Sequence, residues 1–302
     1  MKYLAIIFLL VFSSVSCQEQ DCLEFEDGVI AYQTFGQGFP VLIINGGPGM
    51  NSKGFESLAK LLSENNKVII YDQRGTGKSV LNEMSASNMT IELMVGDIER
   101  LREHLGYKSW IILGQSFGGM LAYAYAAKHP DRVQAMVQSH SGGMSLRNVA
   151  SFNVRNGLTS SENDSLDHYS LLIQRNPENE EFQKKRALFM AKAYVVGSEH
   201  EETISERLLQ VNREINSMLW EDMRLNIFDK TEEMKEFEKN LLIMHGLQDV
   251  VPVDIAENSH NILPNSKLVT MGNCGHYGWL DRPEVYLKEV KAFLRTNSEQ
   301  IN

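Results

Sequence analysis

The order of strand and helix patterns predicts an α/β fold with a mostly parallel sheet flanked by helices. Apolar, β-branched runs alternate with segments of helical periodicity, and strands that are hydrophobic on both faces are typical of parallel sheets covered on both sides. The strand-like runs are 29–35, 41–45, 68–71, 110–113, 135–139, 241–245 and 267–271. The helical patterns are 55–62, 91–105, 117–128, 253–260 and 284–294.

The alternation breaks over residues 145–240, where the chain is charged, helix-prone and without a strand run of comparable quality. The simplest interpretation is a helical cap inserted after the sixth strand, at 135–139, with the chain rejoining the sheet afterwards. We therefore expect a core of residues 21–144 and 241–298 and a cap of residues 145–240. A separate helical domain is the alternative, but a single insertion between sheet strands favours a cap.

Length and composition allow one large domain with an insertion, because the chain has 302 residues and 43% of them are hydrophobic. The formal net charge of −10 argues against nucleic acid as a partner, since its phosphates would repel the protein. The three cysteines, Cys17, Cys22 and Cys274, have no metal-ligand spacing, so we expect no structural metal. Cys22 and Cys274 either pair in an oxidising compartment or stay free, and we expect Cys274 to be a small buried filler.

The N-terminus has the pattern of a secretory signal. Lys2 precedes an apolar stretch at 3–12 that is too short to span a bilayer, and small residues follow it. We expect a signal peptide over residues 1–16, with Cys17 as the lipidated first residue of the mature chain. Ser14 departs from the aliphatic residue usual in a lipoprotein signal, so ordinary cleavage near this point with Cys17 unmodified is the alternative. Either way the sequence predicts export in a bacterium, to the periplasm or as a membrane-anchored lipoprotein.

The most informative motif is the Gly-x-Ser-x-Gly segment at 114–118, which lies between a strand pattern and a helix pattern. This layout is typical of a nucleophile elbow, in which glycines allow a sharp turn that exposes the serine hydroxyl at the edge of the sheet. Ser116 is the candidate nucleophile. The amide of Phe117, at the start of the following helix, is then free to stabilise an oxyanion.

Serine catalysis also needs a histidine base and an acid that orients it, and these follow the serine in the order acid, then histidine. Asp249 ends the loop after the strand at 241–245, and His276 lies in the loop after the strand at 267–271. We expect Ser116 to attack a carbonyl and His276 to take its proton and return it to the leaving group. Asp249 would fix the tautomer of the imidazole and stabilise its cationic form.

Other candidates for the acid and the base fit the pattern less well. Asp254 and Asp281 fall within or beyond helix starts, where a capping or solvent role is expected. His129 closes the helix after the elbow, and His245 ends its strand too early to reach the serine. His140 also lies near a strand end.

A second glycine-rich segment, Asn45-Gly46-Gly47-Pro48-Gly49, follows the strand at 41–45. Glycines permit close backbone approach and leave amides free, as the other half of an oxyanion hole requires. A plain turn is the alternative, since Gly-Pro-Gly is good turn chemistry. The strand before it and the elbow downstream favour the oxyanion interpretation.

Together these segments resemble the proline iminopeptidase family of α/β-hydrolases. The family pattern combines His-Gly-Gly-Pro-Gly, Asp-Gln-Arg-Gly-x-Gly-x-Ser and the serine elbow, which match 45–49, 72–79 and 114–119 here. The likeness covers about 27–127 and 241–294. By this resemblance Gly47 and Phe117 would supply the oxyanion amides, and the triad would be Ser116, Asp249 and His276. The chain departs from the pattern at Asn45, where the family has histidine, and we expect a modest effect on loop geometry.

The resemblance also bears on two further segments. We expect Asp72-Gln73-Arg74 to be structural and to tie the oxyanion loop to the sheet through hydrogen bonds of the arginine. Family aminopeptidases hold the free amino terminus of the substrate with cap carboxylates, and Trp220-Glu221 resembles a Trp-Glu pair of that kind. Glu221 is therefore the candidate substrate-binding residue, although most acidic residues of the cap must be solvated surface charges.

The resemblance implies an exported aminopeptidase that releases an N-terminal residue from peptides through a Ser-His-Asp acyl-enzyme. A carboxylesterase, or another hydrolase of small molecules, is the alternative. A non-catalytic binding protein on the same fold is disfavoured, because the serine, acid and histidine are all present in the right order. The mechanism requires no cofactor, and the expected partners are a peptide or small-molecule substrate and, if Cys17 is lipidated, a membrane.

Overall fold

The computed structural model describes residues 21–147 and 152–298. The predicted signal peptide and Cys17 lie outside these residues. The described chain builds one eight-stranded sheet in the order β1-β2-β4-β3-β5-β6-β7-β8. β1 and β2 pair antiparallel with their neighbours, and all other neighbouring strands are parallel. The strands are β1 (Asp21–Phe25), β2 (Gly28–Phe35), β3 (Phe39–Ile44), β4 (Asn66–Tyr71), β5 (Trp110–Gln115), β6 (Val133–Ser139), β7 (Leu241–Gly246) and β8 (Ser266–Met271).

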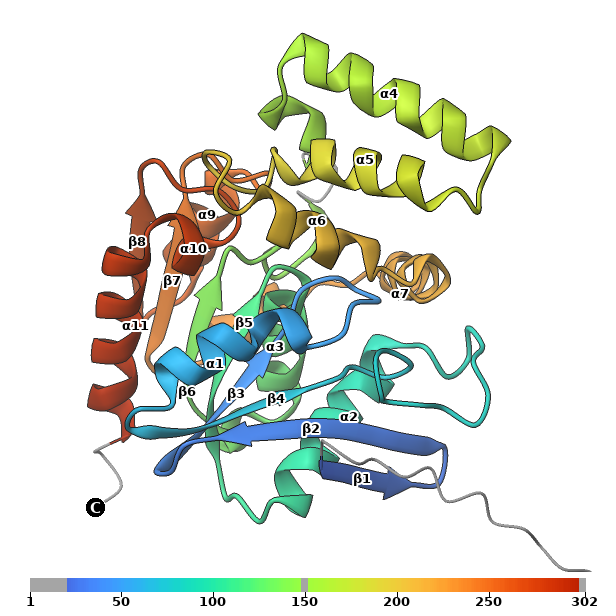
Figure 1. The fold of residues 1–302 in the computed structure, drawn as a ribbon. Helices are drawn as coiled ribbons and strands as arrows, with labels where there is room; N and C mark the ends of the chain where they lie inside the picture. The colour runs from blue at the N-terminus through green and yellow to red at the C-terminus, as the bar shows by residue number, and fades with distance from the viewer. Residues whose placement is uncertain (1–20, 148–151, 299–302) are drawn as a thin grey trace, which may run out of the picture.

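Helices cover both faces of this sheet (Figure 1). The central strands alternate buried side chains between two hydrophobic clusters, as in β3, where Leu42 and Ile44 join one cluster and Val41 and Ile43 the other. The first cluster includes α2, α3 and α9, and the second includes α1 and α11. These helices are α1 (Glu56–Leu62), α2 (Ile91–His104), α3 (Phe117–Lys128), α9 (Val253–Ile262) and α11 (Pro283–Ser298), with the short α10 (Gly278–Asp281) before the last.

The fold class predicted from the sequence is confirmed, and the strand that precedes the cap is the sixth. The strand runs found in the sequence do not include β1. The run at 135–139 is therefore the fifth of those runs, but it is the sixth strand of the sheet. β1 is short, lies at the edge of the sheet and alternates exposed Asp21 and Glu24 with half-buried residues. It has no continuous apolar run, which is the pattern that identifies buried parallel strands in the sequence.

Between β6 and β7 the described residues form helices that stand over one end of the sheet (Figure 1). A capping box starts α4, in which Thr159 and Glu162 satisfy each other's backbone amides. α4 and α5 pack together and project away from the sheet (Figure 1). The cap helices are α4 (Ser160–Arg175), α5 (Glu180–Ala191), α6 (Glu201–Leu209), α7 (Arg213–Leu225) and α8 (Thr231–Lys235).

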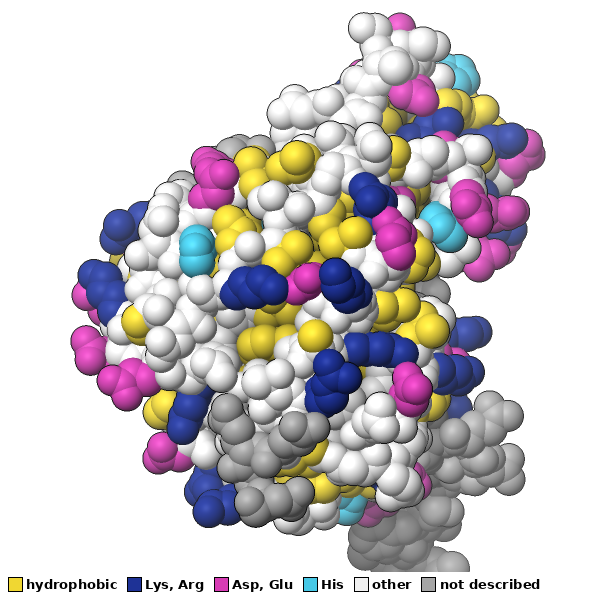
Figure 2. Space-filling view, turned by 90° about the vertical axis from the view of Figure 1, so that its left-hand side faces the viewer, with side chains coloured by type: hydrophobic (Ala, Val, Ile, Leu, Met, Phe, Trp, Pro, Cys, Tyr) yellow, Lys and Arg dark blue, Asp and Glu magenta, His cyan; other side chains and the backbone are white. Residues whose placement is uncertain are grey.

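The surface carries charges of both signs. Lysine and arginine side chains are interspersed with aspartate and glutamate on the face shown in Figure 2. Within 21–147 and 152–298, no helix is both long enough and apolar enough to cross a bilayer.

Candidate active site

The predicted elbow is the junction of β5 and α3. Ser116 lies between them with a φ of 56°, in the left-handed region that a serine rarely adopts, and it is half-buried. The turn depends on small neighbours, because a Cβ atom on Gly118 would lie 2.1 Å from the carbonyl oxygen of Ile44. Glycine at this position therefore lets α3 start directly against β3, which brings the amide of Phe117 to the carboxyl end of the sheet.

His276 and Asp249 meet at the same edge of the sheet. Nδ1 of His276 lies 2.7 Å from Oδ1 of Asp249, and the side chain of Asp249 is completely buried. The amide of Val251 also donates to this carboxylate at 3.0 Å. Burial by itself would raise the pKa of Asp249, but the charge and hydrogen bond of His276, with the nearby His140 and His245, lower the pKa below its usual value. The acid is thus held ionised beside the imidazole.

The loop of His276 is fixed beside the elbow. The side-chain amide of Gln115, the residue before Ser116, donates to the carbonyl of His276 at 3.3 Å. The amide of His276 donates to the carbonyl of Tyr194 in the cap at 2.7 Å. Ser116 and the His276–Asp249 pair thus lie on loops that meet at one edge, and their catalytic roles stay predictions.

Asp281, a competitor for the role of triad acid, has a structural role instead. Its carboxylate accepts hydrogen bonds from the amides of Gly275 at 2.7 Å and Val196 at 3.1 Å. Burial raises the pKa of this carboxyl, and the two amides only partly offset that effect. Asp281 therefore joins the loop of His276 to the cap.

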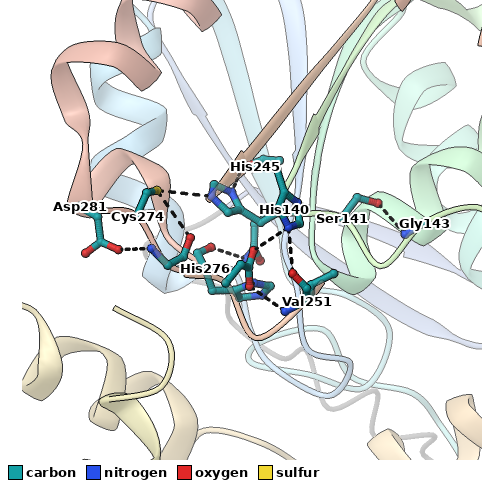
Figure 3. Close-up of polar contacts among 12 residues, drawn as sticks. His140, Ser141, Gly143, His245, Val251, Cys274, His276 and Asp281 are labelled. Atoms are coloured by element: carbon teal, nitrogen blue, oxygen red, sulfur yellow. Dashed lines mark hydrogen bonds and ion pairs between the residues drawn. The ribbon is translucent and has the colours of Figure 1, made fainter. Parts of the chain in front are cut away.

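Two histidines that we did not assign to the site, His140 and His245, lie close together near His276 (Figure 3). His245 donates from Nε2 to the carbonyl of Val251 at 2.8 Å, and the same nitrogen is 3.8 Å from Oδ2 of Asp249. His140 stacks on His245 with ring centroids 5.8 Å apart, and its Nε2 lies 3.8 Å from Sγ of Cys274. Burial lowers the pKa of His140 to about 3, so this ring is neutral.

A signal for these histidines was present in the sequence. His140 directly follows β6 and His245 lies near the end of β7, and these two strands are parallel neighbours. The carboxyl ends of parallel neighbours meet at one edge of a sheet, so both rings had to lie near the acid. Cys274 is fully buried, as predicted, and burial raises the pKa of its thiol to about 12.

The glycine loop lies against Ser116. A Cβ atom on Gly46 would be 2.8 Å from Cβ of Ser116, which places the loop directly over the elbow. Asn45 shapes the loop from within, because its side-chain amide donates to the carbonyls of Gly46 at 2.9 Å and Met50 at 3.0 Å. Gly47 is half-buried with a φ of 153°. The residue that departs from the family pattern thus organises the backbone of the loop.

The role predicted for Arg74 is wrong. Its guanidinium forms a buried two-pronged ion pair with Asp97 of α2, with both nitrogen–oxygen distances at 2.7 Å. Its two neighbours hold the loop instead. The side-chain amide of Gln73 donates to the carbonyl of Asn45 at 2.7 Å, and the carboxylate of Asp72 accepts from the backbone amide and the hydroxyl of Ser52, both at 2.8 Å. The sequence pattern does not show that the carboxylate of Asp97 on α2 lies next to Arg74, so this ion pair was not predicted.

The structure separates the two members of the predicted Trp-Glu pair. Trp220 packs edge-on against Phe117, with ring centroids 6.0 Å apart, so it reaches the elbow. The side chain of Glu221 is 54% exposed and forms an ion pair with Arg224 one turn further along α7. A substrate ammonium would therefore compete with Arg224 for this carboxylate, and the binding role of Glu221 stays a prediction.

Comparison with known proteins places the chain in a family. A family model for the α/β-hydrolase fold matches residues 40–283. The chain therefore belongs to the α/β-hydrolases.

Proline iminopeptidases are among the proteins that the chain resembles along most of its length. The enzyme of Lactobacillus crispatus is 28% identical over 266 residues, covering 84% of this chain and 89% of the relative. The crystal structure of proline iminopeptidase from Mycobacterium smegmatis superposes with a TM-score of 0.70 at 20% identity, over 94% of this chain and 100% of that one.

An esterase has the same fold. The enzyme from Thermogutta terrifontis superposes with a TM-score of 0.69 at 22% identity, over 90% of this chain and 94% of its own. At this level of identity, similarity between structures shows the shared fold alone.

Proposed function

We propose that this α/β-hydrolase is a serine hydrolase in which Ser116, His276 and Asp249 form the catalytic triad. The observation that carries the proposal is the 2.7 Å contact between His276 Nδ1 and Asp249 Oδ1, on a loop tied to the serine elbow. Nδ1 is then committed to the carboxylate, which leaves Nε2 to accept the serine proton and to return it to the leaving group. The amides of Gly47 and Phe117 stabilise the negative charge of the tetrahedral intermediate.

We further propose that the substrate is a peptide from which the enzyme releases the N-terminal residue. Support comes from the proline iminopeptidases that resemble the chain along most of its length. Of the segments that carry the sequence resemblance, the Gly-Gly-Pro-Gly loop lies beside the elbow, and Gln73 of the Asp-Gln-Arg segment is hydrogen-bonded to Asn45 at the start of that loop.

A carboxylesterase activity is the second candidate. The specific observation in its favour is the ion pair between Glu221 and Arg224. Glu221 is the cap carboxylate expected to bind the amino terminus of a peptide, and Arg224 already occupies it. An esterase needs no such carboxylate, and esterases share the fold.

Side-by-side assays separate the two candidates. A series of amino-acid 4-nitroanilides, including the proline derivative, is compared with short-chain nitrophenyl esters, using wild type and Ser116→Ala. An aminopeptidase cleaves at least one anilide, and Ser116→Ala abolishes that turnover. Rapid ester cleavage with no anilide turnover would overturn the peptidase assignment. Full turnover by Ser116→Ala would overturn both.

We also propose that the protein is exported and that Cys17 is lipidated, on the charge and hydropathy pattern of residues 1–17. In a bacterial host, the mature protein should fractionate with membranes and carry an acylated N-terminal cysteine by mass spectrometry. Cys17→Ser should move it to the soluble exported fraction. A wild-type chain that retains Met1 in the cytoplasm would contradict export, and an exported chain with an unmodified Cys17 would contradict lipidation alone.

A further inference from the structure

The cap holds the glycine loop of the candidate oxyanion hole. Three carbonyls within residues 46–49 accept hydrogen bonds from cap residues in or just before α6 and α7, so the loop is fastened along its length. The donors are Nη2 of Arg207 to Gly46 at 3.4 Å, Nδ2 of Asn216 to Pro48 at 2.9 Å and the amide of Asn212 to Gly49 at 2.8 Å. Of the three donors, only the first is charged.

Arg207 is a buried cation whose charge no carboxylate balances. It is 4% exposed, and no acidic side chain of the described chain lies within ion-pair distance of it. Its Nε and Nη1 atoms are buried without a hydrogen-bond partner. Burying a charge in this way is costly, because the lost hydration is not replaced by an opposite charge.

The surroundings nevertheless fit the guanidinium closely. It lies over the ring of Phe55, with its central carbon 4.6 Å from the ring centroid. Gly54 makes room for it, because a Cβ atom there would be 2.4 Å from Nη1 of Arg207. An unpaired cation in a fitted site beside an oxyanion loop is suited to a negative charge that exists only during the reaction.

Through its hydrogen bond to the carbonyl of Gly46, the positive charge of Arg207 can act on the oxyanion donor. The carbonyl of Gly46 and the N–H of Gly47 belong to the same peptide group, and Gly47 is the proposed oxyanion donor. Donation to the carbonyl oxygen withdraws electrons from the peptide and makes its N–H a stronger donor, as in any hydrogen-bonded chain. Asn45 donates to the same oxygen at 2.9 Å, so a neutral and a charged donor polarise one peptide.

We propose that Arg207 is a positioning residue of the cap that polarises the Gly46–Gly47 peptide and so strengthens the oxyanion hole. The inference rests on the proposed serine hydrolase mechanism. Arg207 does not touch the oxyanion, and it acts through the backbone of the loop. Its effect therefore falls on the transition state, where negative charge develops, rather than on the bound substrate.

The test compares Arg207→Lys, which keeps the positive charge, with Arg207→Gln, which keeps an N–H donor on a shorter, neutral side chain. Asn216→Ala is the matched control, since it removes the hydrogen bond from an uncharged cap side chain to the carbonyl of Pro48 in the loop. Each variant is assayed for kcat and KM on the best chromogenic substrate and for inhibition by a boronic acid, which forms a tetrahedral anionic adduct with the serine. Circular dichroism and thermal melting check the fold of each variant.

We expect Arg207→Gln to lower kcat about tenfold with little change in KM, a fraction of the roughly 100- to 1000-fold cost of losing an oxyanion donor outright. Its affinity for the boronic acid should fall in parallel. Arg207→Lys should retain most of the kcat and most of the boronic acid affinity. Asn216→Ala should lower kcat and boronic acid affinity in parallel, and each by less than Arg207→Gln does.

The inference would be overturned if a folded Arg207→Gln kept the kcat and boronate affinity of wild type, or if Arg207→Lys lost as much kcat and boronate affinity as Arg207→Gln does. An effect of Arg207→Gln on KM alone would also overturn it and would assign Arg207 to substrate binding. If Arg207→Gln fails to fold while Arg207→Lys is folded and fully active, the charge is structural and the inference also fails. Absence of Ser116-dependent turnover in wild type would instead end the proposed function itself. The Ser116→Ala comparison separates that outcome from a failure of this inference alone.

Discussion

Nδ1 of His276 faces Oδ1 of Asp249 across 2.7 Å. The geometry commits one ring nitrogen to the acid and leaves the other for proton transfer. Replacing the carboxylate by an amide tests that assignment. Asp249→Asn should keep the fold and lower kcat by about four orders of magnitude, because the amide favours the wrong imidazole tautomer. Steady-state kinetics with circular dichroism as the fold control checks this, and a loss below tenfold would mean that Asp249 is not the triad acid.

Acid should unfold the protein partly through His140. Its pKa is about 3 in the folded state and 6.5 as an unperturbed group, so the unfolded chain binds the proton first. The free energy of unfolding therefore falls as pH drops from 6.5 towards 3, by about 1.4 kcal/mol per pH unit from this group. The lowered pKa of Asp249 acts in the same direction, and its main lowering cause, His276, is present in both wild type and variant.

His140→Asn isolates the histidine term. Asparagine tolerates the φ of 51° at this position and cannot take up the proton. Urea unfolding at a series of pH values should give a flatter dependence for the variant between pH 6.5 and 3. Parallel curves for the two proteins would show that His140 does not titrate on unfolding.

The elbow should tolerate no side chain at Gly118. Gly118→Ala pushes a methyl group into the backbone of Ile44, so we expect a loss of about 3 kcal/mol or more in stability, or no folded protein. Gly96→Ala in α2 is the control, because its Cβ atom would meet only Arg100 Nη1 at 3.6 Å. Alanine there should stabilise the helix by about 1 kcal/mol. Equal unfolding midpoints for the two variants in urea would contradict this account of the turn.

Glu221 has a selective test. If its carboxylate holds the amino terminus of a substrate, Glu221→Gln should raise KM for amino-acid anilides and leave ester hydrolysis unchanged, because only the former carry an ammonium group. Arg224→Gln is the control for the ion pair, since it frees the carboxylate and should not raise KM for anilides. Equal losses on anilides and esters would assign Glu221 a packing role.

Local patterns in the sequence were enough to predict the sheet and the elbow. The buried parallel strands are continuous apolar runs, and Ser116 is marked by its flanking glycines, which the turn requires sterically. The edge strand β1 was missed because it lacks such a run. The sequence places His140 and His245 near the ends of two strands, but that these strands are neighbours and that the two rings stack is seen only in the structure.

Contacts of long side chains between distant segments were the least predictable. Arg74 was expected at the oxyanion loop and is paired with Asp97 of α2. Arg207, in the cap, reaches the loop at Gly46, although nothing in its local sequence distinguishes it from other arginines on cap helices. Such contacts depend on how the cap sits on the sheet, which local periodicity does not encode.

The most direct test of the serine hydrolase assignment is covalent labelling with a fluorophosphonate, followed by peptide mass spectrometry. The serine oxygen displaces fluoride and forms a bond to phosphorus, so the label marks an activated serine. We predict one adduct, on Ser116, which is absent from Ser116→Ala and forms far more slowly in His276→Ala. An intact wild-type protein that stays unlabelled, or that is labelled equally after Ser116→Ala, would contradict the account.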